Sequence, residues 1–106
     1  MLSGTSFSQG YEVTLKIDGM PDSVLIMGNF YGERTYVKDT ARASDGLFVF
    51  SGNSPLENGM YFIAAGKSRI FDFIIFNDQT FTLETSGPDY LENMTVTGSV
   101  DNTLFV

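Results

Sequence analysis

The feature that most constrains this chain is a series of eight short segments with the apolar spacing of β-strands. In residues 11–18 (YEVTLKID), apolar and polar side chains alternate, as in a strand with one buried face. Residues 23–30 (SVLIMGNF) are almost continuously apolar, which is typical of a strand buried on both faces or at a sheet centre. The predicted strands are residues 11–18, 23–30, 35–43, 47–51, 59–65, 69–76, 80–85 and 94–97.

Turn-forming residues separate these segments. Ser44-Asp45-Gly46 is a strong turn signal because Asp-Gly supports positive φ angles, and residues 31–34 (YGER) have the composition of a hairpin loop. Gly28, inside a predicted strand, indicates a β-bulge or a close approach of another group to the backbone. No helix-length amphipathic stretch occurs before residue 98, so the crossover helices of a parallel α/β sheet have no place.

The sequence therefore predicts an all-β fold, an antiparallel β-sandwich of about eight short strands. Its core is expected to consist of the apolar residues on the inward faces of these strands. They are Val13, Leu15, Ile17, Leu25, Met27, Phe48, Phe50, Tyr61, Ile63, Phe73, Ile75, Phe81, Leu83 and Val96.

Residues 11–98 form the predicted sandwich domain, and the two ends differ from it. Residues 1–10 are predicted to be a flexible N-terminus, either an ordinary one or the stub of a signal peptide, since Ser6-Phe7-Ser8 has the small–x–small form that precedes signal cleavage. Residues 99–106 combine helix-capping residues with an apolar end. They predict the start of a linker or helix leading to a downstream region, with a final edge strand as the alternative.

Composition excludes several chemistries. The chain has no Cys and no His, so it holds no disulfide, thiol nucleophile or Ser–His–Asp triad. Six Lys and Arg against thirteen Asp and Glu give a net charge of −7, which disfavours nucleic acid and anionic membranes as partners. No apolar run reaches the ~18–20 residues that span a bilayer. No metal site and no cofactor are expected.

The order of turn and strand motifs gives the chain a resemblance to a known family. These motifs are residues 19–23 (GMPDS), 25–32 (LIMGNFYG), 36–41 (YVKDTA), 45–52 (DGLFVFSG), 59–61 (GMY), 81–85 (FTLET), 93–99 (NMTVTGS) and 101–102 (DN). Together they resemble the β-rich N-terminal domain, itself of unknown function, of exported thiol–disulfide oxidoreductases of the thioredoxin-like AhpC/TSA superfamily. The resemblance covers residues 10–106. In such proteins a thioredoxin-like module with a Cys-x-x-Cys motif follows further along the chain, and this sequence contains no such motif.

This resemblance implies a non-catalytic accessory or interaction domain in a protein exported to the periplasm or cell surface. Its expected partner is a downstream thioredoxin-like domain, in the same chain or in another protein. The alternative is a stand-alone cell-surface or periplasmic β-sandwich module that binds a glycan or a peptide on one sheet face.

Candidate contact residues lie on the hairpin of residues 29–36. Asn29, Tyr31, Arg34 and Tyr36 combine an amide, a guanidinium and aromatic rings, which suits a ligand or partner contact. The alternative is that the rings cap the end of the core.

Asp72, inside an apolar run, is expected on the solvent face of an edge strand, where a charge blocks aggregation. If buried instead, it would need Arg69 or Arg42 as a partner.

Overall fold

The computed structural model describes residues 10–20, 23–76, 78–87, 89–90 and 92–99. Almost all of the predicted flexible N-terminus and of the predicted linker or helix start, at residues 1–9 and 100–106, lies outside the described residues. Within the described residues there is no helix long and apolar enough to cross a membrane.

All eight predicted strands are present, and their ends agree with the predicted ones to within one residue. They are β1 (Tyr11–Asp18), β2 (Val24–Tyr31), β3 (Arg34–Arg42), β4 (Leu47–Gly52), β5 (Gly59–Ala65), β6 (Ser68–Ile75), β7 (Thr80–Ser86) and β8 (Thr95–Thr97). Asp45 and Gly46, with φ angles of 53° and 81°, form the predicted turn between β3 and β4. Both positive angles are those of a type I′ turn.

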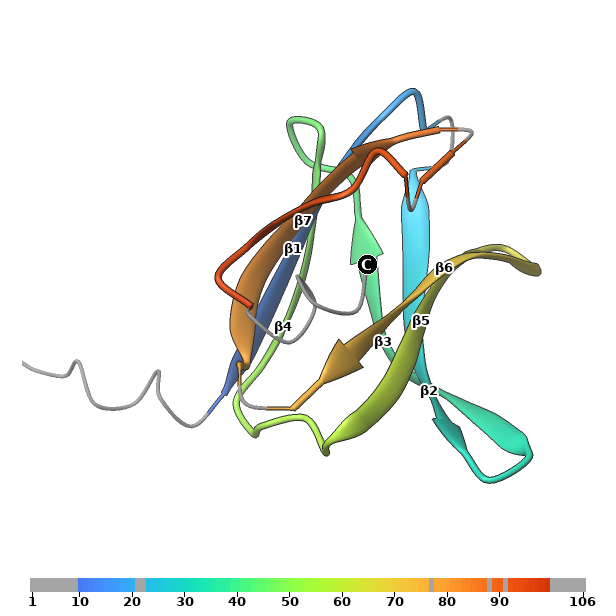
Figure 1. The fold of residues 1–106 in the computed structure, drawn as a ribbon, viewed down its shortest axis with the longest axis vertical. Coiled ribbons are helices and arrows are strands. Elements are labelled where there is room, and N and C mark those ends of the chain that lie inside the picture. Colours follow the sequence, from blue (N-terminus) through green and yellow to red (C-terminus); the bar gives the residue numbers. More distant parts are fainter. Residues whose placement is uncertain (1–9, 21–22, 77, 88, 91, 100–106) are drawn as a thin grey trace, which may run out of the picture.

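The strands form two four-stranded sheets that pack face to face as a sandwich (Figure 1). Sheet A has the order β4-β1-β7-β8, and sheet B has the order β3-β2-β5-β6. The predicted sandwich is confirmed, and β2 has the predicted place inside its sheet. Pairing is antiparallel in every ladder of the described strands except that between β1 and β7, which is parallel. No helix is needed here, because the chain passes through sheet B between these two strands.

The core lies between the inward faces of the two sheets. Thirteen of the fourteen predicted core residues are buried; the exception is Val96, which is half-buried. Val96 lies on β8, the short edge strand of sheet A, where less of the other sheet covers it. The prediction also missed four buried apolar residues. These are Ala41, Phe62, Ala64 and Phe71.

Candidate functional site

The four predicted contact residues lie together on the β2–β3 hairpin, which projects beyond the body of the sandwich (Figure 1). The register pairs Asn29 with Tyr36 and Tyr31 with Arg34. All four side chains are therefore on one face of the hairpin, here called the hairpin row. Tyr31 is 75% exposed and Tyr36 is 47% exposed, whereas Asn29 is buried at the base of the row. The row thus offers two open rings and a guanidinium.

Asn29 faces the inside of the sandwich. It is the cross-strand partner of the fully buried Tyr61. Its Oδ1 atom is buried and accepts no hydrogen bond within the described part of the chain. This amide therefore supports the base of the row rather than presenting itself at the surface.

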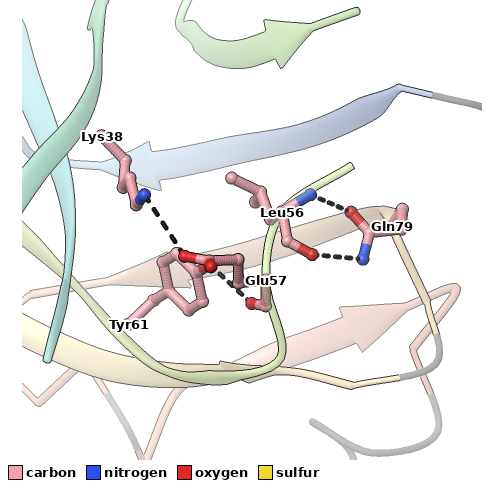
Figure 2. Close-up of polar contacts among 5 residues, drawn as sticks. All are labelled: Lys38, Leu56, Glu57, Tyr61 and Gln79. Atoms are coloured by element: carbon pink, nitrogen blue, oxygen red, sulfur yellow. Dashed lines mark hydrogen bonds and ion pairs between the residues drawn. The ribbon is translucent and has the colours of Figure 1, made fainter. Parts of the chain in front are cut away.

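A set of polar contacts fixes the loop between β4 and β5 beside the base of the hairpin (Figure 2). The side-chain amide of Gln79 pairs with the backbone of Leu56, accepting from its N–H at 2.8 Å and donating to its carbonyl at 3.1 Å. The Tyr61 hydroxyl donates to the carbonyl of Glu57 at 2.6 Å, and burial raises the pKa of that hydroxyl. Lys38 Nζ lies 3.6 Å from Glu57 Oε1. The loop is therefore tied to sheet B and to the connection between β6 and β7.

A second polar link joins the two sheets directly. The Tyr11 hydroxyl on β1 donates to Asp39 Oδ2 on β3 at 2.8 Å. Burial, and then the hydrogen bond to Asp39, raise the pKa of Tyr11 to about 12. A neutral Tyr11 is therefore part of the folded structure.

The opposite, outward face of sheet B carries a groove of about 390 Å³ that crosses the strands. It takes residues from β3, β2, β5 and β6 and from the turn between the last two. The lining residues, which define the groove below, are Ile26, Thr35, Val37, Phe62, Ala64, Gly66, Lys67 and Arg69. Val37 is 66% exposed, whereas Phe62 and Ala64 are buried in the floor.

The floor of the groove depends on the absence of a side chain at Gly28. A Cβ atom there would lie 2.5 Å from the Phe62 ring and 2.6 Å from the carbonyl oxygen of Tyr36. The bare backbone lets the Phe62 ring cross β2 and meet Phe30, with ring centroids 5.3 Å apart. The guanidinium carbon of Arg69 lies 4.7 Å and 5.1 Å from these two centroids. The predicted close approach at Gly28 is confirmed.

Two β-bulges aim residues into the groove. The register between β2 and β3 shifts between Met27 and Gly28. As a result, Val37 pairs with Gly28, and the Val37 side chain faces outward. A second shift, between Ile63 and Ala64, pairs Arg69 with Ala64 on the same outward face. Strict alternation along β3 and β6 would have turned both side chains toward the other face, so the bulges assemble the groove.

The basic side chains of the two sheets differ in whether they form ion pairs. Lys16 and Lys38 have carboxylate partners, but Lys67 and Arg69 form no ion pair with any described residue. Asp72 lies outward on β6, which is an edge strand as predicted, and is half-buried opposite Phe62. Its Oδ1 atom is buried without a hydrogen-bond partner among the described residues, and neither Arg69 nor Arg42 forms an ion pair with it.

Sequence reasoning did not identify the groove. The available signal was that 23–30 and 59–65 are apolar at successive positions, so that both faces of β2 and β5 carry apolar side chains. Among the described residues, no three Asp or Glu side chains converge on a point where they could hold a metal ion.

No curated protein and no solved structure matches this chain. A family model does match, over residues 11–105. The match begins at the first residue of β1 and includes all eight strands. The chain therefore belongs to the DUF4369 family, a domain of unknown function.

Proposed function

We propose that this domain is a non-catalytic interaction module of an exported thiol–disulfide oxidoreductase, where it binds a thioredoxin-like domain of the same chain or of another protein. The observation that carries the proposal is the groove on the outward face of sheet B. Concave surfaces that combine an apolar lining with a few polar groups are the usual form of binding sites, and this groove has that composition. The motif order that resembles these oxidoreductases supplies the identity of the partner and the location in the periplasm or at the cell surface.

The surface is divided in a way that suits this role. The groove and the hairpin row lie on opposite faces of the same β2–β3 hairpin, which projects beyond the sandwich (Figure 1), and the rings of Tyr31 and Tyr36 are exposed. Tyrosine and arginine are enriched among the residues that contribute most to binding at protein interfaces. A partner seated in the groove would reach these rings by wrapping around the projecting hairpin.

Site-specific photo-crosslinking in the cells that make the protein tests the proposal. A benzophenone amino acid replaces Val37, in the groove, or Val49, the matched exposed valine on the outward face of sheet A. We expect a product from position 37 that joins this domain to a thioredoxin-like domain, and no such product from position 49. Equal products from both positions, or a position-37 product without any redox domain, would contradict the proposal.

The groove also favours the peptide form of the alternative, a stand-alone binding module. Its aromatic floor residue, Phe62, is buried under the guanidinium of Arg69 and offers no open ring face on which a sugar would stack. Capture of peptides by position 37, without a redox domain, supports this second function.

A further inference from the structure

The groove has the shape of a site for side chains. It runs across the four strands of sheet B, so the backbone groups beneath it are already paired within the sheet. An added strand would find no free hydrogen-bonding edge there. With a volume of about 390 Å³, it is at the small end of ligand-binding cavities. A short segment that inserts a few side chains fits this space.

The two sides of the groove differ in chemistry. Ile26 on β2 and Val37 on β3 line one side with aliphatic groups. Lys67 in the β5–β6 turn and Arg69 on β6 come from the other side, and the Arg69 guanidinium reaches over Phe62 toward Phe30. These two cations are without ion-pair partners in the described structure, although the whole chain carries a net charge of −7. A cationic rim in an otherwise acidic protein is complementary to a carboxylate carried by the partner.

The position of Arg69 favours contact with such a carboxylate. Its guanidinium carbon lies 4.7 Å and 5.1 Å from the ring centroids of Phe30 and Phe62, and these contacts limit the rotation of the side chain. A held, planar guanidinium binds a carboxylate through two parallel hydrogen bonds. Less side-chain freedom is then lost on binding, so the contact is stronger than one to a mobile lysine.

Asp72 fixes the direction of the bound segment. It faces outward opposite Phe62, whereas Arg69 pairs with Ala64, nearer to the turn. An acidic group near Asp72 would be repelled. The carboxylate of the occupant therefore belongs on the Lys67 side, and its apolar side chains belong over Ile26 and Val37.

From these observations we infer that the groove binds an extended segment of a partner protein in which a glutamate or aspartate is flanked by apolar residues. The carboxylate contacts Arg69 and Lys67, and the apolar side chains fill the floor between Val37 and Phe62. This inference rests on the proposed interaction function and adds to it the chemistry of the segment that is recognised.

Three synthetic peptides test the inference. They share the pattern Leu-Xaa-Phe-Xaa-Leu, in which Xaa is Glu, Gln or Lys, and each is titrated into the ¹⁵N-labelled 106-residue chain while amide shifts are followed by NMR. We expect the Glu peptide to shift amides of the groove residues and to bind about tenfold more tightly than the Gln peptide. The Lys peptide should not bind. Added salt should weaken the binding of the Glu peptide.

Three charge-removing variants locate the contact. Arg69→Gln should weaken binding of the Glu peptide about tenfold, and Lys67→Gln about threefold, while both leave any binding of the Gln peptide unchanged. Lys16→Gln removes the same charge from the outward face of sheet A and should change nothing. Because Arg69 also covers the aromatic floor, a circular dichroism melt checks that variant, and Lys67→Gln in the exposed turn provides the independent test.

The outcomes separate this inference from the proposed function. Equal binding of the Glu and Gln peptides, or amide shifts outside the groove, overturns the inference. The same holds if no peptide binds while position 37 still crosslinks to a redox domain, in which case the interaction function stands alone. Binding of the Glu peptide in the groove without that crosslink supports the inference and contradicts the redox partner.

Discussion

The outward faces of the two sheets are built on opposite patterns. On sheet A, β1 turns Glu12, Thr14, Lys16 and Asp18 to the solvent. On sheet B, the central strands β2 and β5 turn Ile26, Phe62 and Ala64 outward. An antiparallel sheet with one face in water normally alternates, as sheet A does, whereas apolar side chains on both faces are typical of a covered sheet. If the proposed interaction function holds, this comparison favours the outward face of sheet B over that of sheet A as the contact surface.

Part of that apolar face is already used within the domain. Phe62 is only 9% exposed because Phe30 and the Arg69 guanidinium cover it, and its burial contributes to folding. Val37 is 66% exposed and contributes little. Sheet B therefore has an aromatic part that stabilises the fold and an aliphatic part that is exposed to solvent, and substitutions should distinguish the contributions of the two parts.

The largest loss of stability is expected from adding a side chain at Gly28, where there is no room for one. Gly28→Ala places a methyl group against both the Phe62 ring and the Tyr36 carbonyl, and neither the backbone nor the packed ring yields easily. We expect the free energy of unfolding to fall by about 2–3 kcal/mol in urea titrations. Ser51→Thr, which adds one methyl group to the outward face of sheet A, should change it by about 0.5 kcal/mol or less. Equal effects would show that the two faces are equally open.

A smaller loss of stability is expected at the contact between the β4–β5 and β6–β7 connections. Gln79, in the connection from β6 to β7, makes two hydrogen bonds to Leu56 in the connection from β4 to β5. Gln79→Ala removes both and should lower the free energy of unfolding by about 1–2 kcal/mol in chemical denaturation. Gln79→Glu keeps an acceptor for the Leu56 N–H and loses the donor, so it should be less harmful than the alanine. The reverse order would show that the amide does not clamp the loop.

The direct link between the sheets should depend on pH. Tyr11→Phe removes the hydrogen bond to Asp39 and should cost about 1 kcal/mol at pH 7. The pKa of Tyr11 is about 12 in the folded chain and about 10 when unfolded. Between pH 10 and pH 12 the unfolded state releases this proton and the folded state retains it, so stability falls as the pH rises.

The free energy of unfolding of the wild-type chain should therefore exceed that of Tyr11→Phe by its full amount below pH 10, and this difference should decline toward pH 12. Urea titrations of both proteins at pH 8, 10 and 11.5 measure it, and the difference between the two curves removes the contribution of other tyrosines and lysines. An advantage that stays constant over this range would mean that the hydroxyl of Tyr11 is not held by the fold.

The strands and most of the core were predictable because they depend on local spacing. Strict alternation correctly predicted that Val13, Leu15 and Ile17 are buried, and the Asp45-Gly46 pair correctly predicted a turn. The parallel pairing of β1 with β7 was not predictable, since the register between strands so distant in sequence is set by the packing of the whole sandwich. The prediction that Val96 is a buried core residue was wrong, because the sequence does not show that β8 is a short strand at the edge of a sheet.

The site was less predictable than the fold. The sequence correctly placed Asn29, Tyr31, Arg34 and Tyr36 on one hairpin, but it did not show that Asn29 faces inward. Alternation assigns Val37 and Arg69 to the wrong face, because each lies next to a bulge whose position depends on the neighbouring strand. A groove assembled by two bulges therefore leaves only an indirect trace, the excess of apolar residues on β2 and β5.

The smallest effect on stability, and the sharpest test of the comparison, is expected from exchanging valine for threonine on each outward face. Val37→Thr and Val49→Thr make the same change at exposed positions on sheets B and A, so each should alter the free energy of unfolding by about 0.5 kcal/mol or less. Binding should separate them. Val37→Thr removes about one buried methyl group from the groove complex and should weaken the Glu peptide about fourfold in the NMR titration, whereas Val49→Thr should leave it unchanged. If both variants bind the peptide as the wild-type chain does, the open apolar part of sheet B is not its binding surface, and the contrast between the two faces concerns folding alone.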